Sequence, residues 1–456
     1  MTIRRKATAF VAMAAIAGTV GISSPVDAAA IGGGGASFLA NMMDICAAQY
    51  NRNTAFNTAS DVVTYASVGS STGKTGFAGG TYKFGGSESA YSSGAPSNLV
   101  YVPLVGGAIA IGYRVDGLKS ANAQVRLTGE LVAKIFAGQI KKWNDPAIAA
   151  ANKATTVAKK LSLSKLGVTV TAKKVASNVT FSVKMTPAAA KKYRNAKVTI
   201  SSATLGGKTG SVINKKYTAP MTKSVSYAAN TSYLVNVGRN AIGTLAVETI
   251  KDGETITFPD LPIRVVHRSD GSGTTNNFAN YLNKSFPSIW TKPTNDSFTT
   301  AFPGSIPTDG SFQSAKGNEG LANYVRDNNG AITYAELSYL EERGLKAAAV
   351  QNPGGRFVSP SPTTSAAWFE GAEVSAEGLV TQNFTYTATD AYPINAISYG
   401  LSSSASSSDN AAVKRFFGYF LNQCAPKNAA AAGYTPLTGA ALAKAVAQVA
   451  KLNGGA

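Results

Sequence analysis

The chain has 456 residues, a length that allows two or three domains of about 100–200 residues each. Hydrophobic residues make up 44% of it and charged residues 15%, which excludes a disordered chain, and its 45 glycines follow no fixed period, which excludes collagen. One histidine and two cysteines exclude a zinc site of the usual Cys/His kind, while the net charge of +19 is large.

The first thirty residues have the pattern of a secretory signal. Three cations at 4–6 precede an Ala-rich apolar run over 7–23, and small residues at 26–30 offer cleavage sites. An uncleaved anchor helix is the alternative, although the run is short and interrupted by glycine. No later run reaches the roughly 20 apolar residues of a membrane span, and Leu99–Tyr113 is better interpreted as a buried strand. We therefore expect a secreted or periplasmic protein with no membrane span after cleavage and no lipid-anchor cysteine.

Short apolar runs alternate with helical stretches over most of the chain, as in Leu127–Gln139, Phe278–Phe286 and Ala411–Leu421. This alternation is typical of βαβ units, so it predicts an α/β fold with ligand-binding loops at the strand ends. Two Gly/Ser-rich turns lie early in this region. Gly32–Phe38 leads into a predicted helix near Leu39–Tyr50, and Ser67–Gly73 follows a strand-like run.

The positive charge is concentrated in one region with its own sequence pattern. Residues 153–259 carry 17 Lys and Arg against 3 Asp and Glu, a net of +14, and the signal segment adds +2. Apolar and polar residues alternate in short runs there, which predicts half-buried strands of a small sandwich. Thr186 and Pro187 begin one predicted helix. We expect an inserted all-β domain over 155–258. Its predicted strands are Val168–Ala172, Val179–Val183, Lys197–Ser201, Ser224–Tyr227 and Tyr233–Val237.

A third Gly/Ser-rich turn, Arg268–Thr275, follows the predicted strand Ile263–Val266. All three turns precede a predicted helix, whose N-terminus offers unpaired N–H groups and a positive dipole end to an anion. Hydroxyl groups add donors, and Arg268 adds a two-pronged cationic donor. One such turn is usually an ordinary loop, but three together indicate an oxyanion site.

The run Ile263–Thr275 resembles the signature of the PstS-type phosphate-binding proteins of bacterial ABC phosphate importers. Further segments match that family in order. They are Gly35–Phe38, Val68–Ser71, Phe84–Glu88, Ile135–Pro146, Gly317–Gly320 and Ala331–Glu336. The resemblance covers roughly 31–152 and 260–440. It implies a type II periplasmic-binding-protein fold whose two lobes close on phosphate.

The resemblance also implies the site and the lobe boundaries. It places phosphate donors at Ser37, Phe38, Ser70, Arg268, Ser272, Gly273 and Thr274, with Asp270 holding the guanidinium of Arg268. Residues 31–113 with 393–456 would form lobe I, and 114–154 with 259–392 would form lobe II. Cys46 and Cys424 then fall on the same lobe, which strengthens a disulfide over the alternative of two separate buried thiols.

Glu88 departs from the family, which usually has aspartate at this position. A carboxylate can accept the O–H of hydrogen phosphate, whereas sulfate has no proton to offer, so the acceptor rejects sulfate. Glutamate keeps this logic but reaches about one C–C bond further. The lobes then close differently or the preferred oxyanion differs. A plain surface residue is the alternative for Glu88.

The basic insert has few aromatic residues and no DNA-binding helix, so nucleic acid is not expected as a partner. We expect residues 155–258 to attract anionic cell-envelope polymers. The alternative is a decoration that only raises solubility.

The leading functional prediction is capture of phosphate outside the membrane, without a cofactor, by a monomer. Separate ABC permease and ATPase subunits would do the transport, because the chain has no GxxxxGK[ST] loop. A surface protein with a relict pocket and a secreted phosphatase are the alternatives. His267 is interpreted as packed rather than catalytic, and Trp143, Trp290 and Trp368 as core or lobe-surface aromatics.

Overall fold

The structure is a computed structural model that describes residues 28–454 except 121–123, 158–160, 176–177, 205–209, 227–230, 247–249, 253–254 and 389. The predicted signal segment lies almost wholly outside the described residues. Within the described part of the chain, no helix combines the length and the apolar character needed to cross a bilayer.

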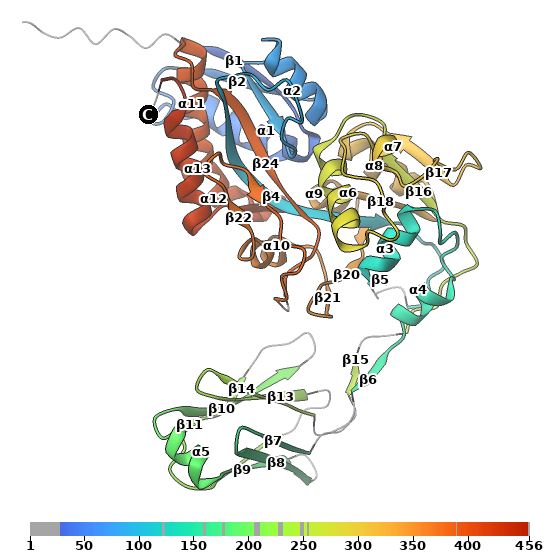
Figure 1. Ribbon diagram of the computed structural model, residues 1–456, viewed down its shortest axis with the longest axis vertical. Helices are drawn as coiled ribbons and strands as arrows, with labels where there is room; N and C mark the ends of the chain where they lie inside the picture. The colour runs from blue at the N-terminus through green and yellow to red at the C-terminus, as the bar shows by residue number, and fades with distance from the viewer. Residues whose placement is uncertain are drawn as a thin grey trace, which may run out of the picture.

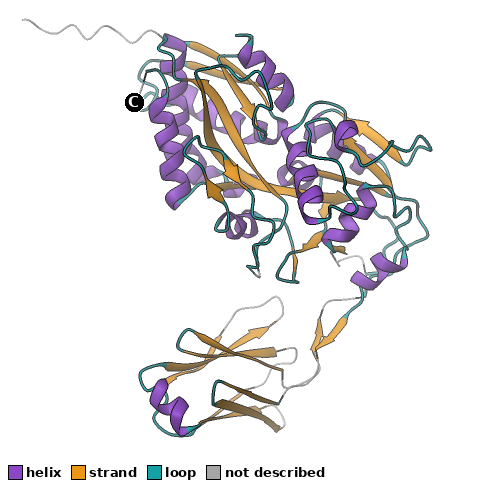
Figure 2. Ribbon diagram, viewed as in Figure 1, coloured by secondary structure: helices purple, strands orange, loops and turns teal. Residues whose placement is uncertain are grey.

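One ten-stranded sheet runs through both lobes of the main body (Figures 1 and 2). Its longest strand is β4 (Leu99–Tyr113), the segment predicted as a buried strand. Residues 99–108 of β4 pair with β24 (Asn395–Ser403) in the first lobe, and residues 109–113 pair with β18 (Ala331–Glu336) in the second. Both faces of β4 are covered, which explains its almost continuous apolar sequence. The predicted α/β fold is confirmed.

The first lobe contains both ends of the described main body. Strand β1 (Ala30–Gly35) pairs in parallel with β2 (Val62–Ser67) and β3 (Phe84–Ser87), and β3 pairs with β24. Helices from the two ends of the chain cover this part of the sheet (Figure 1). They are α1 (Ser37–Arg52), α2 (Ser70–Ala78), α11 (Ser408–Tyr419), η1 (Phe420–Cys424), α12 (Ala425–Asn428) and α13 (Gly439–Lys451).

The second lobe is built on β16 (Arg264–Arg268), which lies in parallel between β17 (Phe312–Ala315) and β18. Its helices are α3 (Gly129–Phe136), α4 (Pro146–Ala151), α6 (Gly273–Ser285), α7 (Phe298–Ala301), α8 (Gly317–Asp327) and α9 (Leu337–Glu341). Helix α10 (Pro362–Phe369), which the predicted grouping assigns to this lobe, packs against β25 (Tyr434–Pro436) and β4.

The basic insert forms a small two-sheet unit with its own hydrophobic core (Figure 1). One sheet has the order β11-β10-β13-β14 and the other the order β12-β9-β8-β7. A pair of short strands, β6 (Thr155–Val157) and β15 (Ile250–Asp252), leads into and out of it. The predicted strands fall in β8 (Val168–Val175), β9 (Asn178–Met185), β10 (Lys197–Thr204), β12 (Met221–Ser226) and β13 (Thr231–Val237). The sequence pattern did not predict β7 (Ser162–Lys165), β11 (Gly210–Lys216) or β14 (Asn240–Ala246).

Helix α5 (Pro187–Lys192) begins as predicted. Thr186 is its N-cap, and the Thr186 hydroxyl accepts a hydrogen bond from the backbone N–H of Ala189 at 3.3 Å. Proline occupies the first turn, where its missing N–H is no loss.

A disulfide joins Cys46 of α1 to Cys424 of η1, with an S–S distance of 2.02 Å and a sequence separation of 378 residues. Both cysteines are fully buried. The Cys46–Cys424 disulfide, which the resemblance favoured over two separate thiols, is therefore present. It links the two ends of the described main body within the first lobe.

Replacing both cysteines with alanine is expected to destabilise the first lobe by about 4 kcal/mol, because the crosslink closes a very long loop in the unfolded chain. Denaturant unfolding of the oxidised protein and the double variant measures the difference. The fully reduced wild-type chain serves as control and should unfold like the variant. Equal stability of the variant and the oxidised protein would contradict the prediction.

Candidate oxyanion-binding site

The three predicted turns meet where the two lobes touch. The backbone N–H of Gly273, the first residue of α6, donates to the Ser70 hydroxyl at the start of α2, at 2.9 Å. The N–H of Gly69 donates to the carbonyl of Gly35, which joins the turn before α2 to the turn before α1. Helices α1 and α2 have no side-chain cap on their first N–H groups. Three helix N-termini therefore lie next to one another, an arrangement suited to an anion.

The close approach of the lobes requires glycine at two positions. Gly69 has φ of +89°, and a Cβ there would lie 2.8 Å from the carbonyl oxygen of Gly271 in the opposite lobe. A Cβ on Gly273 would lie 2.7 Å from the backbone nitrogen of Glu88. Both turns approach the other lobe more closely than any side chain would allow.

Arg268 is the buried cation of the site. Its Nε donates to Asp270 Oδ1 at 2.7 Å, and its Nη2 donates to Asp270 Oδ2. Its side chain is only 1% exposed. Asp270 also accepts from the N–H of Gly317 at 3.1 Å. Burial acts to raise the pKa of Asp270, but these hydrogen bonds and the charge of Arg268 hold that pKa below its ordinary value. Asp270 takes two of the five guanidinium N–H groups, and the described residues accept no hydrogen bond from the other three, which suits a ligand.

The hydroxyls on α6 divide into two kinds. Ser272 is the N-cap, and its Oγ accepts from the N–H of Thr275 at 3.1 Å. An accepting hydroxyl keeps its hydrogen for a further acceptor. The Oγ1 of Thr274 is fully buried and has no hydrogen-bond partner within the described structure. Buried polar atoms are nearly always paired, so this hydroxyl points to a ligand.

Glu88 is buried, 4% exposed, which rules out the surface alternative. Its Oε2 accepts from the Ser70 hydroxyl at 3.2 Å, and its Oε1 accepts from the Ser398 hydroxyl at 2.7 Å. Burial raises the pKa of Glu88 to about 7, although Ser398, Arg268 and Ser70 act to lower it. The site therefore holds one acceptor that changes protonation near neutral pH.

Ser37 and Phe38 lie in the first turn of α1. Ser37 Oγ accepts from the backbone N–H and the side-chain Nδ2 of Asn318, at 3.1 and 3.0 Å. Phe38 is fully buried, and its carbonyl accepts from the hydroxyl of Tyr434 at 2.7 Å. All eight predicted ligand residues and Asp270 are thus linked through direct contacts or through the helix turns that carry them.

Two residues that no sequence pattern predicted, Asn318 and Ser398, hydrogen-bond to the predicted residues Ser37 and Glu88. Asn318 lies in the quoted match Gly317–Gly320, so its segment was marked but its role was not. Ser398 lies in the buried strand β24, which has several other polar residues, and no local pattern distinguishes it from them.

Contacts around Asp296 join the lobes beside the site. Asp296 Oδ2 lies 2.9 Å from Lys74 Nζ and accepts from the Ser71 hydroxyl at 2.8 Å, both on α2. Asn276 of α6 donates to Asp296 Oδ1 at 3.0 Å. These contacts hold the N-termini of α2 and α6 together.

Other chemistry-bearing residues lie elsewhere. His267 stacks on Phe298 with ring centroids 4.4 Å apart, and burial lowers its pKa, so the packed interpretation is confirmed. Trp143, Trp290 and Trp368 are buried, as predicted for core aromatics. Across the described residues, no group of three or more His, Cys, Asp or Glu could hold a metal ion.

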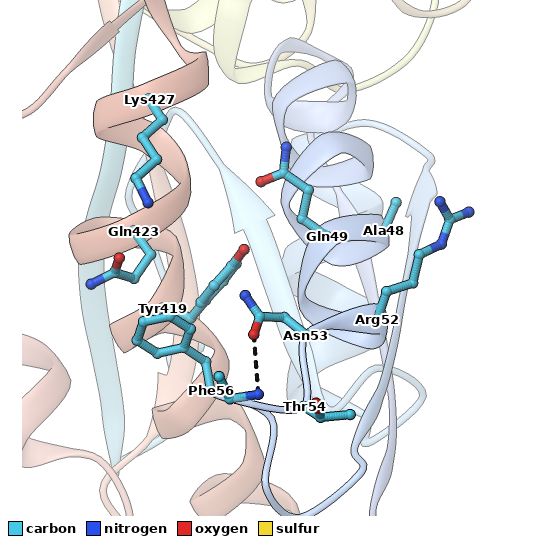
Figure 3. A pocket seen from close by; sticks show the side chains of 10 residues that line it. Ala48, Gln49, Arg52, Asn53, Thr54, Phe56, Tyr419, Gln423 and Lys427 are labelled. Carbon is cyan, nitrogen blue, oxygen red and sulfur yellow. Dashed lines mark hydrogen bonds between the residues drawn. The ribbon is translucent and has the colours of Figure 1, made fainter.

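A hollow also lies at the far end of α1, between Arg52 and the residues Tyr419 and Lys427 (Figure 3). The 16-residue helix places it about 24 Å from the N-terminal turn that carries Ser37. This hollow is therefore separate from the oxyanion cluster.

Comparison with known proteins places the fold in one class. A family model described as a PBP superfamily domain matches residues 22–257 and 244–423. The phosphate-binding protein PstS of Xylella fastidiosa is 26% identical over 374 residues, covering 81% of this chain and 70% of its own length. PstS of Haemophilus influenzae is 25% identical over 389 residues, covering 84% and 80%.

Solved structures agree on the fold. The high-affinity periplasmic phosphate-binding protein PfluDING, solved with phosphate at pH 8.5, has a TM-score of 0.56 at 19% identity, covering 92% of this chain and 93% of its own. A phosphate-binding protein from Stenotrophomonas maltophilia has a TM-score of 0.51 at 18% identity, with the same coverage.

The chain belongs to the PBP superfamily, the two-lobed periplasmic-binding-protein class. Its curated relatives within that class are PstS-type proteins, which confirms the resemblance predicted from Ile263–Thr275 and the other ordered segments.

Proposed function

We propose that this protein captures inorganic phosphate between its lobes as an exported monomer, without turnover, and delivers it to separate ABC permease and ATPase subunits. One observation carries the proposal most strongly. A cluster of helix N-termini, hydroxyls and the Arg268 guanidinium surrounds one buried acceptor, Glu88. Donors suit the phosphate oxygens, and the acceptor suits the proton of hydrogen phosphate.

The moving units in this proposal are the two lobes of the sequence grouping, residues 31–113 with 393–456 and residues 114–154 with 259–392, except that α10 moves with the first lobe because it packs against β25 and β4. Strand β4 crosses between them, and the contacts of Lys74 and Ser71 with Asp296 would break when the lobes open. The insert, residues 155–258, is proposed to keep the protein at an anionic component of the cell envelope.

Titration calorimetry with phosphate, sulfate and arsenate tests the proposal. Tight binding of phosphate and arsenate with rejection of sulfate is expected, because phosphate and arsenate carry a proton at neutral pH and sulfate does not. Failure to bind any oxyanion would favour the alternative of a surface protein with a relict pocket. Release of phosphate from a phosphoester would favour a phosphatase.

Thr274→Val is expected to lower phosphate affinity by about 10- to 100-fold, the effect of losing one hydrogen bond to a charged ligand. The ligand-free variant should be as stable as the wild type or more so, because the hydroxyl is buried without a partner there. Calorimetry and thermal unfolding measure the two effects.

Thr275→Val is the matched control. The Thr275 hydroxyl is buried and lies 2.7 Å from the hydroxyl of Tyr334. This variant should lose about 1 kcal/mol of stability and little phosphate affinity. The reverse pattern in the two variants would contradict the assignment of Thr274 to the ligand.

A further inference from the structure

The positive charge of the insert is concentrated at one end of it. The sequence from 161 to 246 contains no Asp or Glu. Nine exposed cations lie at the end that carries α5, which we call the basic tip: Lys165, Lys184, Lys191, Lys192, Arg194, Lys197, Lys215, Lys216 and Arg239. The insert is joined to the main body at the opposite end, through β6 and β15 (Figure 1).

Contacts within the insert bring these cations together. The N–H of Thr186, which caps α5, donates to the carbonyl of Gly167 in the β7–β8 turn. The N–H of Gly238 in the β13–β14 turn donates to the carbonyl of Lys197. Lys197 and Lys216 lie directly opposite each other on neighbouring antiparallel strands. Like charges in that position are destabilising, so the tip is arranged for a negatively charged partner.

The β7–β8 turn adds an apolar group to the basic tip. Lys165 pairs with Val168, so Leu166 and Gly167 form a two-residue turn, with φ of +55° and +76°. Such turns favour asparagine at the first position, because a leucine with positive φ is strained. Leu166 is nevertheless there and is 49% exposed. A strained, exposed leucine points to a contact outside the chain.

Of the large apolar side chains that the described part of the insert exposes, only Leu166 lies at this tip. Leu161 lies at the opposite end of β7, and Leu234, 43% exposed, lies in the middle of β13. Lysines supply most of the charge, and they act as point charges rather than as forked donors for one defined group. An end with dispersed cations and one exposed leucine fits a surface better than a linear chain.

We propose that the basic tip docks on a lipid bilayer rich in anionic headgroups, with Leu166 inserted between the lipids. Polybasic attraction and an apolar insertion are the two signals that give stable peripheral binding. The contact lies on the insert and does not depend on the phosphate site, so it would hold the two lobes near a membrane with either lobe free to move.

Cosedimentation of the full mature chain with vesicles tests the proposal. The vesicles contain phosphatidylcholine alone or an equal mixture with phosphatidylglycerol, at low and at physiological salt. Binding is expected only to the anionic vesicles and should weaken with salt. Lys191→Gln with Lys192→Gln should lower binding about 20-fold. Leu166→Asn should lower it at least about fivefold.

Leu166→Asn also separates loss of contact from loss of fold, because asparagine suits the left-handed turn and should leave the melting temperature unchanged or raise it. Leu234→Asn is the matched control and should bind vesicles like the wild type. Phosphate affinity should be unaltered in all these variants. The proposal is overturned if anionic vesicles do not bind at low salt. It is also overturned if the lysine variant loses binding while Leu166→Asn does not, because a purely electrostatic contact would favour the anionic polymers expected from the sequence.

Discussion

Replacing Arg268 with alanine is expected to lower phosphate affinity by about 1000-fold, or roughly 4 kcal/mol. The guanidinium is buried at the end of β16. A buried, charge-assisted hydrogen bond to a doubly charged oxyanion is stronger than the hydrogen bond that a water molecule would make in its place. Titration calorimetry gives the change directly. Arg268→Lys keeps the charge but loses the fork, so it should recover only part of the affinity.

The variant also leaves Asp270 buried without its main partner, which destabilises the fold by itself. A second two-pronged Arg–Asp pair, with a buried carboxylate and a partly exposed guanidinium, separates the two effects. Asp61 accepts from Arg415 Nε at 2.9 Å and from Arg415 Nη2 at 2.8 Å, within the first lobe. Arg415→Ala should lower stability with little change in phosphate affinity. If Arg268→Ala and Arg415→Ala lowered affinity equally, Arg268 would have no direct contact with the ligand.

The sequence could predict those parts of the site that depend on local geometry. A Gly/Ser-rich turn between a strand and a helix can be recognised from a short stretch of sequence, because the strand ends and the helix begins within a few residues. Arg268, Ser272 and Thr274 belong to one such turn: the turn itself indicated an anion site with a cationic donor, and the family resemblance implied the roles of the two hydroxyl residues. Local pattern also located Thr186 at the start of α5, whereas the role of Ser70, the first residue of α2, was implied only by the family resemblance.

The partners that fix those residues could not be predicted, because they come from distant parts of the chain. Ser398 is 310 residues from Glu88, and Asn318 is 281 residues from Ser37. Each is one polar residue in a segment whose pattern only predicts a buried strand or a helix. Pairing across the lobes depends on how β4 crosses between them, which no local pattern specifies.

In the insert, alternation predicted β8, β9, β10, β13 and one edge strand, β12, but missed the other three edge strands, β7, β11 and β14. Edge strands have one unpaired side and a weaker requirement for buried residues on alternate positions. The strained turn at Leu166 was also not predicted, because the sequence Lys-Leu-Gly-Val resembles an ordinary strand more than a turn.

Glu88→Gln is expected to tighten sulfate binding about 30-fold at pH 8.5. With a pKa of about 7, Glu88 is mostly ionised at that pH and repels an anion that has no proton to donate. Glutamine offers an N–H donor at every pH. Sulfate itself does not titrate in this range, so its affinity reports the state of residue 88. Calorimetry with sulfate at pH 5.5 and 8.5 measures the effect.

The wild type should approach the variant as the pH falls. Protonation of Glu88 below pH 7 converts the acceptor to a donor, so sulfate affinity should rise about 30-fold between pH 8.5 and 5.5, while that of Glu88→Gln stays constant. A pH-independent sulfate affinity in the wild type would mean that the Glu88 carboxyl does not face the bound anion.

Stability gives an independent measure of the same group. The folded pKa of Glu88 lies above its ordinary value of 4.5, so its stabilising contribution is complete below pH 4.5 and is lost as the pH rises through about 7. That contribution amounts to roughly 3 kcal/mol. Glu88→Gln should remove this part of the pH dependence of unfolding in the ligand-free protein.

Glu336 is the control for burial without ligand contact. It is fully buried, it accepts from the N–H of Ser338 at 3.0 Å, and burial raises its pKa to about 8. Glu336→Gln should therefore also flatten the pH dependence of stability, over a window that extends to about pH 8, while leaving sulfate affinity unchanged. Both glutamates are buried and have raised pKa values, but only the Glu88 carboxyl is expected to face the anion, and sulfate selectivity should follow from that difference.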